Sequence, residues 1–470
     1  MSVSNSIASD PNEAPTAMLK FLREHWQLFL IMVLWLLTGM YLNQAVFALL
    51  PLSVFFFKSR ELWPEVLFGL LLVLVLSDIE KDMFPMMRVF KNAKNFYVLA
   101  IAMIFLLEVK RFAPLSSVFN IFLPFFIYSI FPLVFSNNMV VGLQKTISYW
   151  LMFLLVPNYV LYNYRRLGWD FIRNLLFFMV AILLAGFVMQ FVDPSLTQIA
   201  GRYRGIFGNP NGMAIYCYLT LMLLGVVVSI NKGLFSFRER VLLFGSIIYF
   251  LIVSGSRASL SAAMIFLVFH RFFAASPFLG LIGLVSLLFV VEVVSSNLEA
   301  IIVSLGLEEY FRLETLEDGS GRYFAWYFSW QHVQNYFVFG GGFSNDENIM
   351  HRARLFLEKE GHQGGVHNTY LSMWLNVGIV GLLLFLRSFF LLFIKASKLV
   401  PMSTAVLFSC LFSIMYESWL MGSLNPYTIV LLMIMTVVTE PEIANWQDFT
   451  NADAAEGTEE EATPVPAIAS

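Results

Sequence analysis

Apolar runs of membrane-spanning length dominate this sequence and limit the folds that it can adopt. They recur from about residue 26 to about residue 439 and are separated by short polar connections. The hydrocarbon core of a bilayer is crossed by about 20 apolar residues in a helix, which satisfies its own backbone hydrogen bonds. The chain is 59% hydrophobic and only 13% charged, which sets it apart from soluble domains. The sequence therefore predicts an all-α, polytopic bundle of transmembrane helices.

The apolar runs predict about twelve to fourteen spans, and the count is a range because several early runs are short. The runs lie at residues 26–42, 43–57, 64–78, 96–110, 117–136, 144–163, 171–193, 211–230, 239–254, 258–273, 276–295, 368–395, 403–421 and 425–439. We expect five segments: a cytoplasmic N-terminal segment (1–25), a transmembrane bundle (26–295), a large outer loop (296–366), C-terminal transmembrane helices (367–439) and a disordered acidic cytoplasmic tail (440–470).

The outer loop is predicted to form a small helical cap over the mouth of the bundle. It is rich in aromatic residues and carries two amphipathic helical patterns, one at 298–309 and one at 322–337. Its outward placement follows from the positive-inside rule, because most Lys and Arg residues fall in connections that are cytoplasmic when the amino terminus is cytoplasmic. The connection at 79–95 disagrees with this map, since it has four basic residues on the predicted outer side.

The first of four polar motifs precedes the span near residue 212. Asn209 followed by Pro210 signals a helix start, because the amide caps the first turn and proline needs no backbone donor there. Free N–H groups and the positive end of the helix dipole then lie beside Arg202 and Arg204, which outlines an anion-binding site. Alternatively, the arginines extend to lipid head groups and Asn209 is only a cap.

The second motif is the tight turn Ser254-Gly255-Ser256-Arg257-Ala258-Ser259. Ser256 is predicted to cap the next helix, which places Arg257 in its first turn. A cation there opposes the helix dipole at a cost of a few tenths of a kcal/mol or more. Because a bound phosphate would reverse that effect, this misfit favours a functional role.

The third motif is Gly319-Ser320-Gly321-Arg322, followed by Trp326 and then by Gly340-Gly341-Gly342. Glycines permit turns and close backbone approach. Without a preceding strand, the triple glycine is weak evidence for a phosphate-binding loop, and a flexible turn explains it better. Arg322 is ambiguous by itself, because an arginine in a solvated loop needs no special explanation.

The fourth motif begins with His367-Asn368-Thr369. Asn368 or Thr369 can cap the next helix, so a third helix start points outward, now with an imidazole at its mouth. The dipole and nearby arginines disfavour the imidazolium, and a neutral histidine can act as a general base. The alternative is a histidine with a purely structural hydrogen-bonding role.

Other chemistries find little support. The spacing of His351, His362 and His367 matches no usual metal-ligand pattern, and the chain has no Asp-x-Asp, Gly-x-Ser-x-Gly or Walker sequence. The two cysteines lie far apart inside apolar runs, where they act as small packing residues. We therefore expect neither a metal nor a cofactor, and nothing in the chain suggests a nucleic-acid partner.

Together the four motifs resemble the O-antigen ligase and O-antigen polymerase superfamily. The resemblance covers roughly residues 195–390, and residues 1–190 add only compatible hydropathy. The matching patterns are Arg204-Gly-x-Phe-x-Asn209-Pro210-Asn211, Ser256-Arg257-Ala258, Ser320-Gly-Arg322, and His367-Asn368-x-x-Leu371 with Gly378 and Gly381.

The resemblance implies a metal-independent glycosyltransferase at the periplasmic face of the bacterial inner membrane, which moves a glycan from undecaprenyl diphosphate to a sugar hydroxyl. Arg204, Arg257 and Arg322 would contact the donor diphosphate, and His367 would activate the acceptor hydroxyl. The outward helix starts could stabilise the leaving diphosphate. Further substrate-binding candidates are Arg202, Asn209, Asn211, Ser256, Asn368 and Trp326.

Two transfers fit the resemblance. A ligase, the leading interpretation, moves the glycan onto lipid A-core in lipopolysaccharide biosynthesis, whereas a polymerase extends lipid-linked repeat units. A transporter of an anionic solute is the alternative from another class, and it predicts charges at the bilayer midplane. The strongest polar motifs lie at one end instead, with Glu417 and Gln190 as the main exceptions. A membrane scaffold whose arginines extend to head groups is a fourth possibility.

Overall fold

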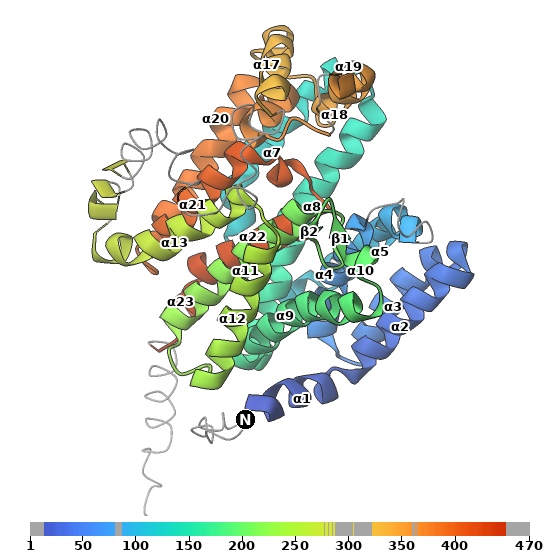
Figure 1. Cartoon of the computed structure of the whole chain (residues 1–470), viewed down its shortest axis with the longest axis vertical. Helices are drawn as coiled ribbons and strands as arrows, with labels where there is room; N and C mark the ends of the chain where they lie inside the picture. The colour runs from blue at the N-terminus through green and yellow to red at the C-terminus, as the bar shows by residue number, and fades with distance from the viewer. Residues whose placement is uncertain are drawn as a thin grey trace, which may run out of the picture.

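The structure is a computed structural model that describes residues 14–79, 87–276, 322–359 and 364–447, with isolated positions at 278–280, 282, 283, 285, 286, 304 and 362. The described part is a helical bundle (Figure 1). Its one sheet is a small hairpin, β1 (Gln198–Ile199) and β2 (Arg202–Tyr203), in which Ile199 lies opposite Arg202. The predicted all-α bundle is confirmed.

The N-terminal half contributes helices up to the β1–β2 hairpin. In chain order they are α1 (Ala14–Glu24), α2 (Trp26–Tyr41), η1 (Asn43–Ala45), α3 (Val46–Ser59), α4 (Trp63–Asp78), α5 (Arg88–Leu107), α6 (Val109–Phe112), α7 (Val118–Ser129), η3 (Phe131–Phe135), α8 (Met139–Leu167), α9 (Trp169–Val192) and α10 (Pro194–Thr197).

The C-terminal half contributes the remaining bundle helices and three short helices above them. They are α11 (Pro210–Ile230), α12 (Phe237–Val253), α13 (Arg257–Ala275), α17 (Arg322–Val333), η6 (Gln334–Tyr336), α18 (Asn345–Arg352), α19 (Arg354–Lys359), α20 (Thr369–Ser397), α21 (Ser403–Tyr416), η7 (Trp419–Met421), α22 (Pro426–Thr439) and α23 (Pro441–Ala444).

Among the described residues, six helical segments are long and apolar enough to cross a membrane: α5, α7 with η3, α8, α9, α11 and α20. Several other predicted spans are shorter apolar helices, among them α2, α21 and α22. A 14-residue helix such as α22 covers only about 21 Å, less than the roughly 30 Å hydrocarbon core. The predicted span at 276–295 lies mostly outside the described residues.

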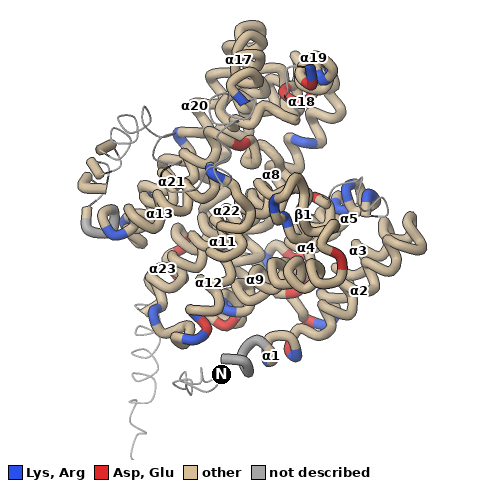
Figure 2. Tube along the Cα trace, viewed as in Figure 1, with Lys and Arg blue, Asp and Glu red and all other residues tan. Residues whose placement is uncertain are grey.

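Two helices, α11 and α22, form the centre of the bundle. Every residue of α22 is buried, and α11 is buried along most of its length. Both sequences are apolar on all sides, which is typical of helices enclosed by others. They pack against each other, and α22 also contacts α4, α8 and α20. Neither helix contains a charged residue, and the charged residues of the bundle lie mostly toward the ends of its helices (Figure 2).

The cap consists of α17, α18 and α19, which stand together at one end of the molecule (Figure 1). It has its own small apolar core, in which Ala325, Val333 and Met350 pack with Leu375 of α20. Residues 322–359 are therefore largely helical, whereas the amphipathic helix predicted at 298–309 lies outside the described residues.

The triple glycine docks the cap on α20. Gly341 and Gly342 donate backbone hydrogen bonds to the carbonyls of Leu375 and Asn376 at 3.0 and 2.8 Å. A Cβ on Gly340 would lie 2.4 Å from the Asn376 carbonyl oxygen, which no side chain tolerates. The segment is thus a close backbone packing site, in place of the flexible turn that the sequence favoured.

Candidate functional site

A cavity of about 790 Å³ lies beneath the cap, between the start of α11, the beginning of α20 and the loop that precedes α22. Its wall combines residues from both halves of the chain. The cationic and imidazole side chains in the wall are Lys145, Arg202 and His367, and the carboxylates are Asp78, Asp346, Glu347 and Glu417.

The start of α11 is built as the sequence predicted. Asn209 Oδ1 accepts a hydrogen bond from the Gly212 backbone N–H at 2.7 Å, and Pro210 occupies the first turn. This cap is a local interaction between neighbours in the chain, so the Asn-Pro signal was sufficient to locate it. It presents Asn209 and Asn211 to the cavity.

Arg202 joins the first two motifs. Its Nε donates to the Ser254 carbonyl at 2.8 Å, and its Nη2 donates to Asn211 Oδ1 at 2.8 Å. The turn before α13 therefore lies against the β1–β2 hairpin. Arg202 also lines the cavity, so one of its faces is held by protein while another borders the open space.

Glu417 is the centre of the polar network. It accepts hydrogen bonds from Asn211 Nδ2 at 3.0 Å, from His367 Nδ1 at 3.1 Å and from Arg322 Nη2. The contacts connect the first, third and fourth motifs, and Arg202 adds the second through Asn211. The four motifs thus meet around one carboxylate, although Glu417 lies 206 residues from Asn211 in sequence.

The protein keeps Glu417 charged although its side chain is only 10% exposed. Burial raises its pKa, but the hydrogen bond from His367, the charge of Arg322 and the hydrogen bond from Asn211 outweigh burial and leave the pKa below its ordinary value. A stable carboxylate at this point can orient a histidine and an arginine together.

The backbone at His367 is held in an unusual conformation. Its φ of +50° is uncommon for a residue with a side chain. Trp326 Nε1 donates to the His367 carbonyl at 3.3 Å, and Asn368 Oδ1 caps α20 by accepting from the Leu371 N–H at 3.0 Å. These contacts hold the residue where α20 begins, at the mouth of the cavity.

The ring of His367 has a defined orientation. Because Nδ1 faces the Glu417 carboxylate, the proton of the neutral ring is assigned to Nδ1, and Nε2 becomes the proton acceptor. A Cβ on Gly364 would lie 2.9 Å from Nε2, so only glycine leaves this nitrogen room. The ring of His362 stands perpendicular to that of His367, with centroids 5.6 Å apart.

The other predicted site residues occupy different positions. Arg204 is only 2% exposed and donates to the carbonyls of Gly208 and Leu196 at 3.0 and 3.2 Å, so it braces the loop before α11. Arg204, Arg257 and Arg322 are not among the residues that line the cavity. Of these three, Arg322 reaches the network through Glu417, and Arg257 begins α13.

The predicted cap by Ser256 is wrong. Ser256 occupies the position before α13, but its side chain makes no capping hydrogen bond. Its hydroxyl instead donates to Ser259 Oγ at 3.3 Å. The hydroxyl therefore acts as a donor to a side chain in the first turn and not as an acceptor for a backbone N–H of that turn.

Two functional candidates were missed by the sequence analysis. Glu417 was noted only as an exception to the one-ended distribution of polar residues, and Asp78 was not singled out. Asp78 Oδ2 accepts hydrogen bonds from the Tyr427 hydroxyl at 2.8 Å and from the Gly208 N–H at 3.4 Å. The available signal was a carboxylate at the end of an apolar run, which is costly unless it has a partner or a role.

The charge of the cavity also differs from expectation. An anion entering it meets Arg202 and Lys145, but Lys145 is paired with Glu347 and Arg322 lies behind Glu417. Asp346 lies at the same wall, where Asn376 Nδ2 donates to it at 3.0 Å. Burial raises the pKa of Asp346. The cations are thus largely balanced by protein carboxylates.

The comparison with protein families gives one match. Residues 241–386 match the family model described as O-antigen ligase, a region that includes Arg257, Arg322 and His367 but neither the loop before α11 nor Glu417. No curated protein matches the chain.

Proposed function

We propose that this protein transfers a glycan from undecaprenyl diphosphate to a sugar hydroxyl, and the match of residues 241–386 to the O-antigen ligase family model supports this proposal. The reaction takes place at the periplasmic face of the bacterial inner membrane, where the cap covers the site. We assign the acceptor as lipid A-core, which makes the protein an O-antigen ligase of lipopolysaccharide biosynthesis.

The pairing of His367 with Glu417 carries this proposal. Glu417 holds the Nδ1 side of the ring at 3.1 Å, which leaves Nε2 as the proton acceptor and proposed general base. It accepts the proton of the acceptor hydroxyl while that oxygen attacks the anomeric carbon of the donor sugar. The bond from this carbon to the diphosphate oxygen breaks, and the diphosphate leaves with the electron pair.

The leaving diphosphate needs positive charge and hydrogen-bond donors. Arg202 lines the cavity beside the first turn of α11, and Lys145 lies in the wall. We also propose that Arg257, the first residue of α13, and Arg322, the first residue of α17, contact the diphosphate of the lipid-linked donor. In this proposal Arg204 acts indirectly, since its hydrogen bonds to Gly208 and Leu196 hold the loop in place.

The test is transfer by purified full-length protein in detergent, with undecaprenyl diphosphate-linked glycan, EDTA, and either lipid A-core or a second donor molecule as acceptor. Glycan on lipid A-core supports the ligase, whereas elongated lipid-linked glycan would reassign the protein as a polymerase. Absence of both products from folded protein would overturn the glycosyltransferase proposal and favour transport of an anionic solute.

A further inference from the structure

The Asp78 side of the cavity is built differently from the His367 side. Asp78 ends α4, in the half of the chain that the family match does not cover, and its partner Tyr427 lies in the first turn of α22. Both residues line the cavity. The Asp78–Tyr427 pair therefore brings a carboxylate and a phenol to a site whose other wall carries His367 and Arg202.

Two glycines at the start of α11 make room for this pair. A Cβ on Gly208 would lie 2.1 Å from the Asp78 carbonyl oxygen, and a Cβ on Gly212 would lie 2.2 Å from the Tyr427 hydroxyl oxygen. Both distances are too short for any side chain. The close approach of this segment to Asp78 and Tyr427 therefore depends on the two glycines. A larger residue at either position would push the segment away from the pair.

The Asp78 carboxylate has capacity for a ligand. In the described part of the chain, its two hydrogen bonds both use Oδ2, so Oδ1 is left to accept from a molecule in the cavity. The Tyr427 hydroxyl donates to Asp78, which leaves its oxygen as a further acceptor. This combination of acceptors suits hydroxyl groups, which donate hydrogen bonds.

The first turn of α11 separates the two sides of the cavity. Asn211 of this turn bonds to Glu417 beside His367, whereas Gly208 and Gly212 contact the Asp78–Tyr427 pair. A helix with its side chains is about 10 Å across, so the two sides are close enough for one substituted sugar to reach both. A sugar with one hydroxyl at His367 can thus place others at Asp78.

We propose that the Asp78–Tyr427 pair binds the acceptor sugar through its hydroxyl groups and thereby selects the hydroxyl that reaches His367. The proposal rests on the glycosyltransferase function proposed above. The donor sugar fits this position less well, because it is bonded directly to the diphosphate, which the proposed function places at Arg202 on the other wall. The acceptor ring has no such bond.

Asp78→Asn tests the subsite because it removes the charge and keeps the size. With purified full-length protein, we expect the KM for lipid A-core to rise about tenfold or more and the KM for the lipid-linked donor to stay within about twofold. Tyr427→Phe, which retains the carboxylate, should raise the acceptor KM less. The matched control Asp170→Asn, an exposed residue at the start of α9, should change neither constant.

An unchanged acceptor KM, or equal rises for donor and acceptor, would overturn the subsite, since a carboxylate that only braces the loop before α11 would not act on one substrate alone. Direct binding separates this failure from failure of the proposed function. Water-soluble core oligosaccharide should bind wild-type protein and the control Asp170→Asn alike in saturation-transfer NMR, and about tenfold more weakly to Asp78→Asn. Binding without transfer refutes the function only, whereas wild-type protein that does not bind refutes the subsite.

Discussion

The two ends of the bundle hold polar networks of similar composition but different design. At the cap end, Glu417 gathers Asn211, Arg322 and His367 at the wall of a cavity. At the other end, Arg165 donates to both oxygens of Glu442 at 2.7 and 2.8 Å, and these two residues do not line that cavity.

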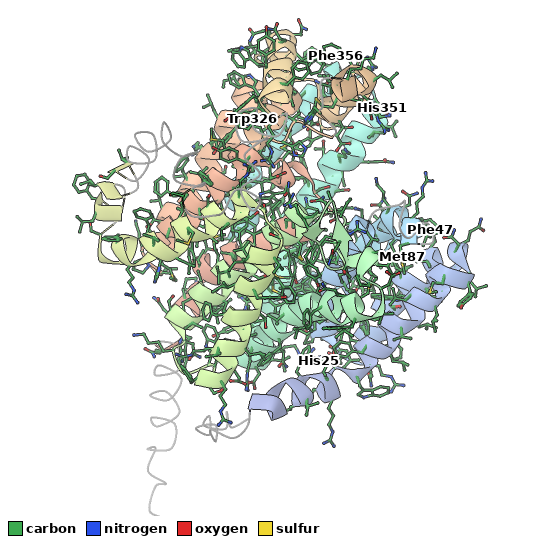
Figure 3. The ribbon with its side chains drawn as sticks, viewed as in Figure 1. His25, Phe47, Met87, Trp326, His351 and Phe356 are labelled. Carbon is green, nitrogen blue, oxygen red and sulfur yellow. The ribbon has the colours of Figure 1, made fainter. Side chains whose placement is uncertain are left out.

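At the end that contains Arg165 and Glu442, which we call the closed end, the polar groups form hydrogen bonds with other groups of the protein. Besides Glu442, Arg165 bonds to the Pro114 carbonyl at 2.8 Å, and Glu440 accepts from the Ser116 hydroxyl at 2.7 Å and the Ser117 N–H at 2.9 Å. His25, which lies at this end of the molecule in Figure 3, pairs with Glu65 at 2.8 Å. Such groups stabilise the junction of helices through hydrogen bonds to other protein groups.

Helix α8 connects the two networks. In α8, Lys145 lines the cavity and Arg165 belongs to the closed end, a separation of about 30 Å along the helix, which is close to the thickness of a membrane core. The comparison teaches that buried charge alone does not identify a reaction site. The distinguishing property is a charged, oriented side chain that borders a cavity.

The largest effect is expected for His367→Ala, because it removes the proposed proton acceptor. Transfer should fall by about 10²- to 10⁴-fold, measured as product formed per folded protein. The control is His351→Ala, which changes an exposed histidine of the cap near the outer end of α18 (Figure 3). Equal losses of transfer in the two variants would contradict this role, because they would show that transfer depends on the integrity of the cap and not on the imidazole of His367.

Glu417→Gln should have the second largest effect on transfer. It keeps the shape of the side chain but weakens its hold on His367 and Arg322, so we expect a loss of about 10- to 100-fold. Full activity in this variant would refute its role in orienting His367.

The same carboxylate predicts a pH dependence of stability. Since the folded protein lowers the pKa of Glu417 from 4.5, its contribution is complete above about pH 4.5 and is lost as the pH falls through the lowered value. The Tm difference between wild type and Glu417→Gln should therefore be constant near neutral pH and shrink below pH 4.5. A difference that grows on acidification would contradict the assignment.

Gly378→Ala should detach the cap without changing a polar group. Gly378 has a φ of +67° within α20, and a Cβ there would lie 2.2 Å from the Val338 carbonyl oxygen. We expect a loss of about 1–3 kcal/mol in the free energy of unfolding, together with reduced transfer. Gly245→Ala in α12 is the control, because a Cβ at Gly245 meets no atom within 4 Å.

The smallest effect is expected at the closed end. Glu442→Gln weakens a partly exposed ion pair with Arg165, so the free energy of unfolding should fall by about 1 kcal/mol or less. Transfer per folded protein should be unchanged, which thermal unfolding and the activity assay measure together. A large loss of transfer with intact stability would mean that the two ends are coupled.

Local signals in the sequence located the helix starts well. The caps by Asn209 and Asn368 form as predicted because donor and acceptor are three residues apart. Ser256 shows the limit of such reasoning, since it occupies the cap position but its hydroxyl donates to Ser259 and accepts no backbone hydrogen bond of the first turn. The triple glycine was ambiguous because its partner, the break in α20 at Gly378, is distant in sequence.

The sequence by itself determined the membrane-embedded helical class, the short motifs and their family resemblance, because hydropathy and capping depend on neighbours along the chain. The tertiary structure alone decided which arginines border the cavity, that Glu417 orients His367, and that Asp78 from α4 meets Tyr427 from α22, 349 residues later. A buried charge takes whichever partner the folded chain brings within hydrogen-bonding distance, and that choice is made by helix packing rather than by any local pattern.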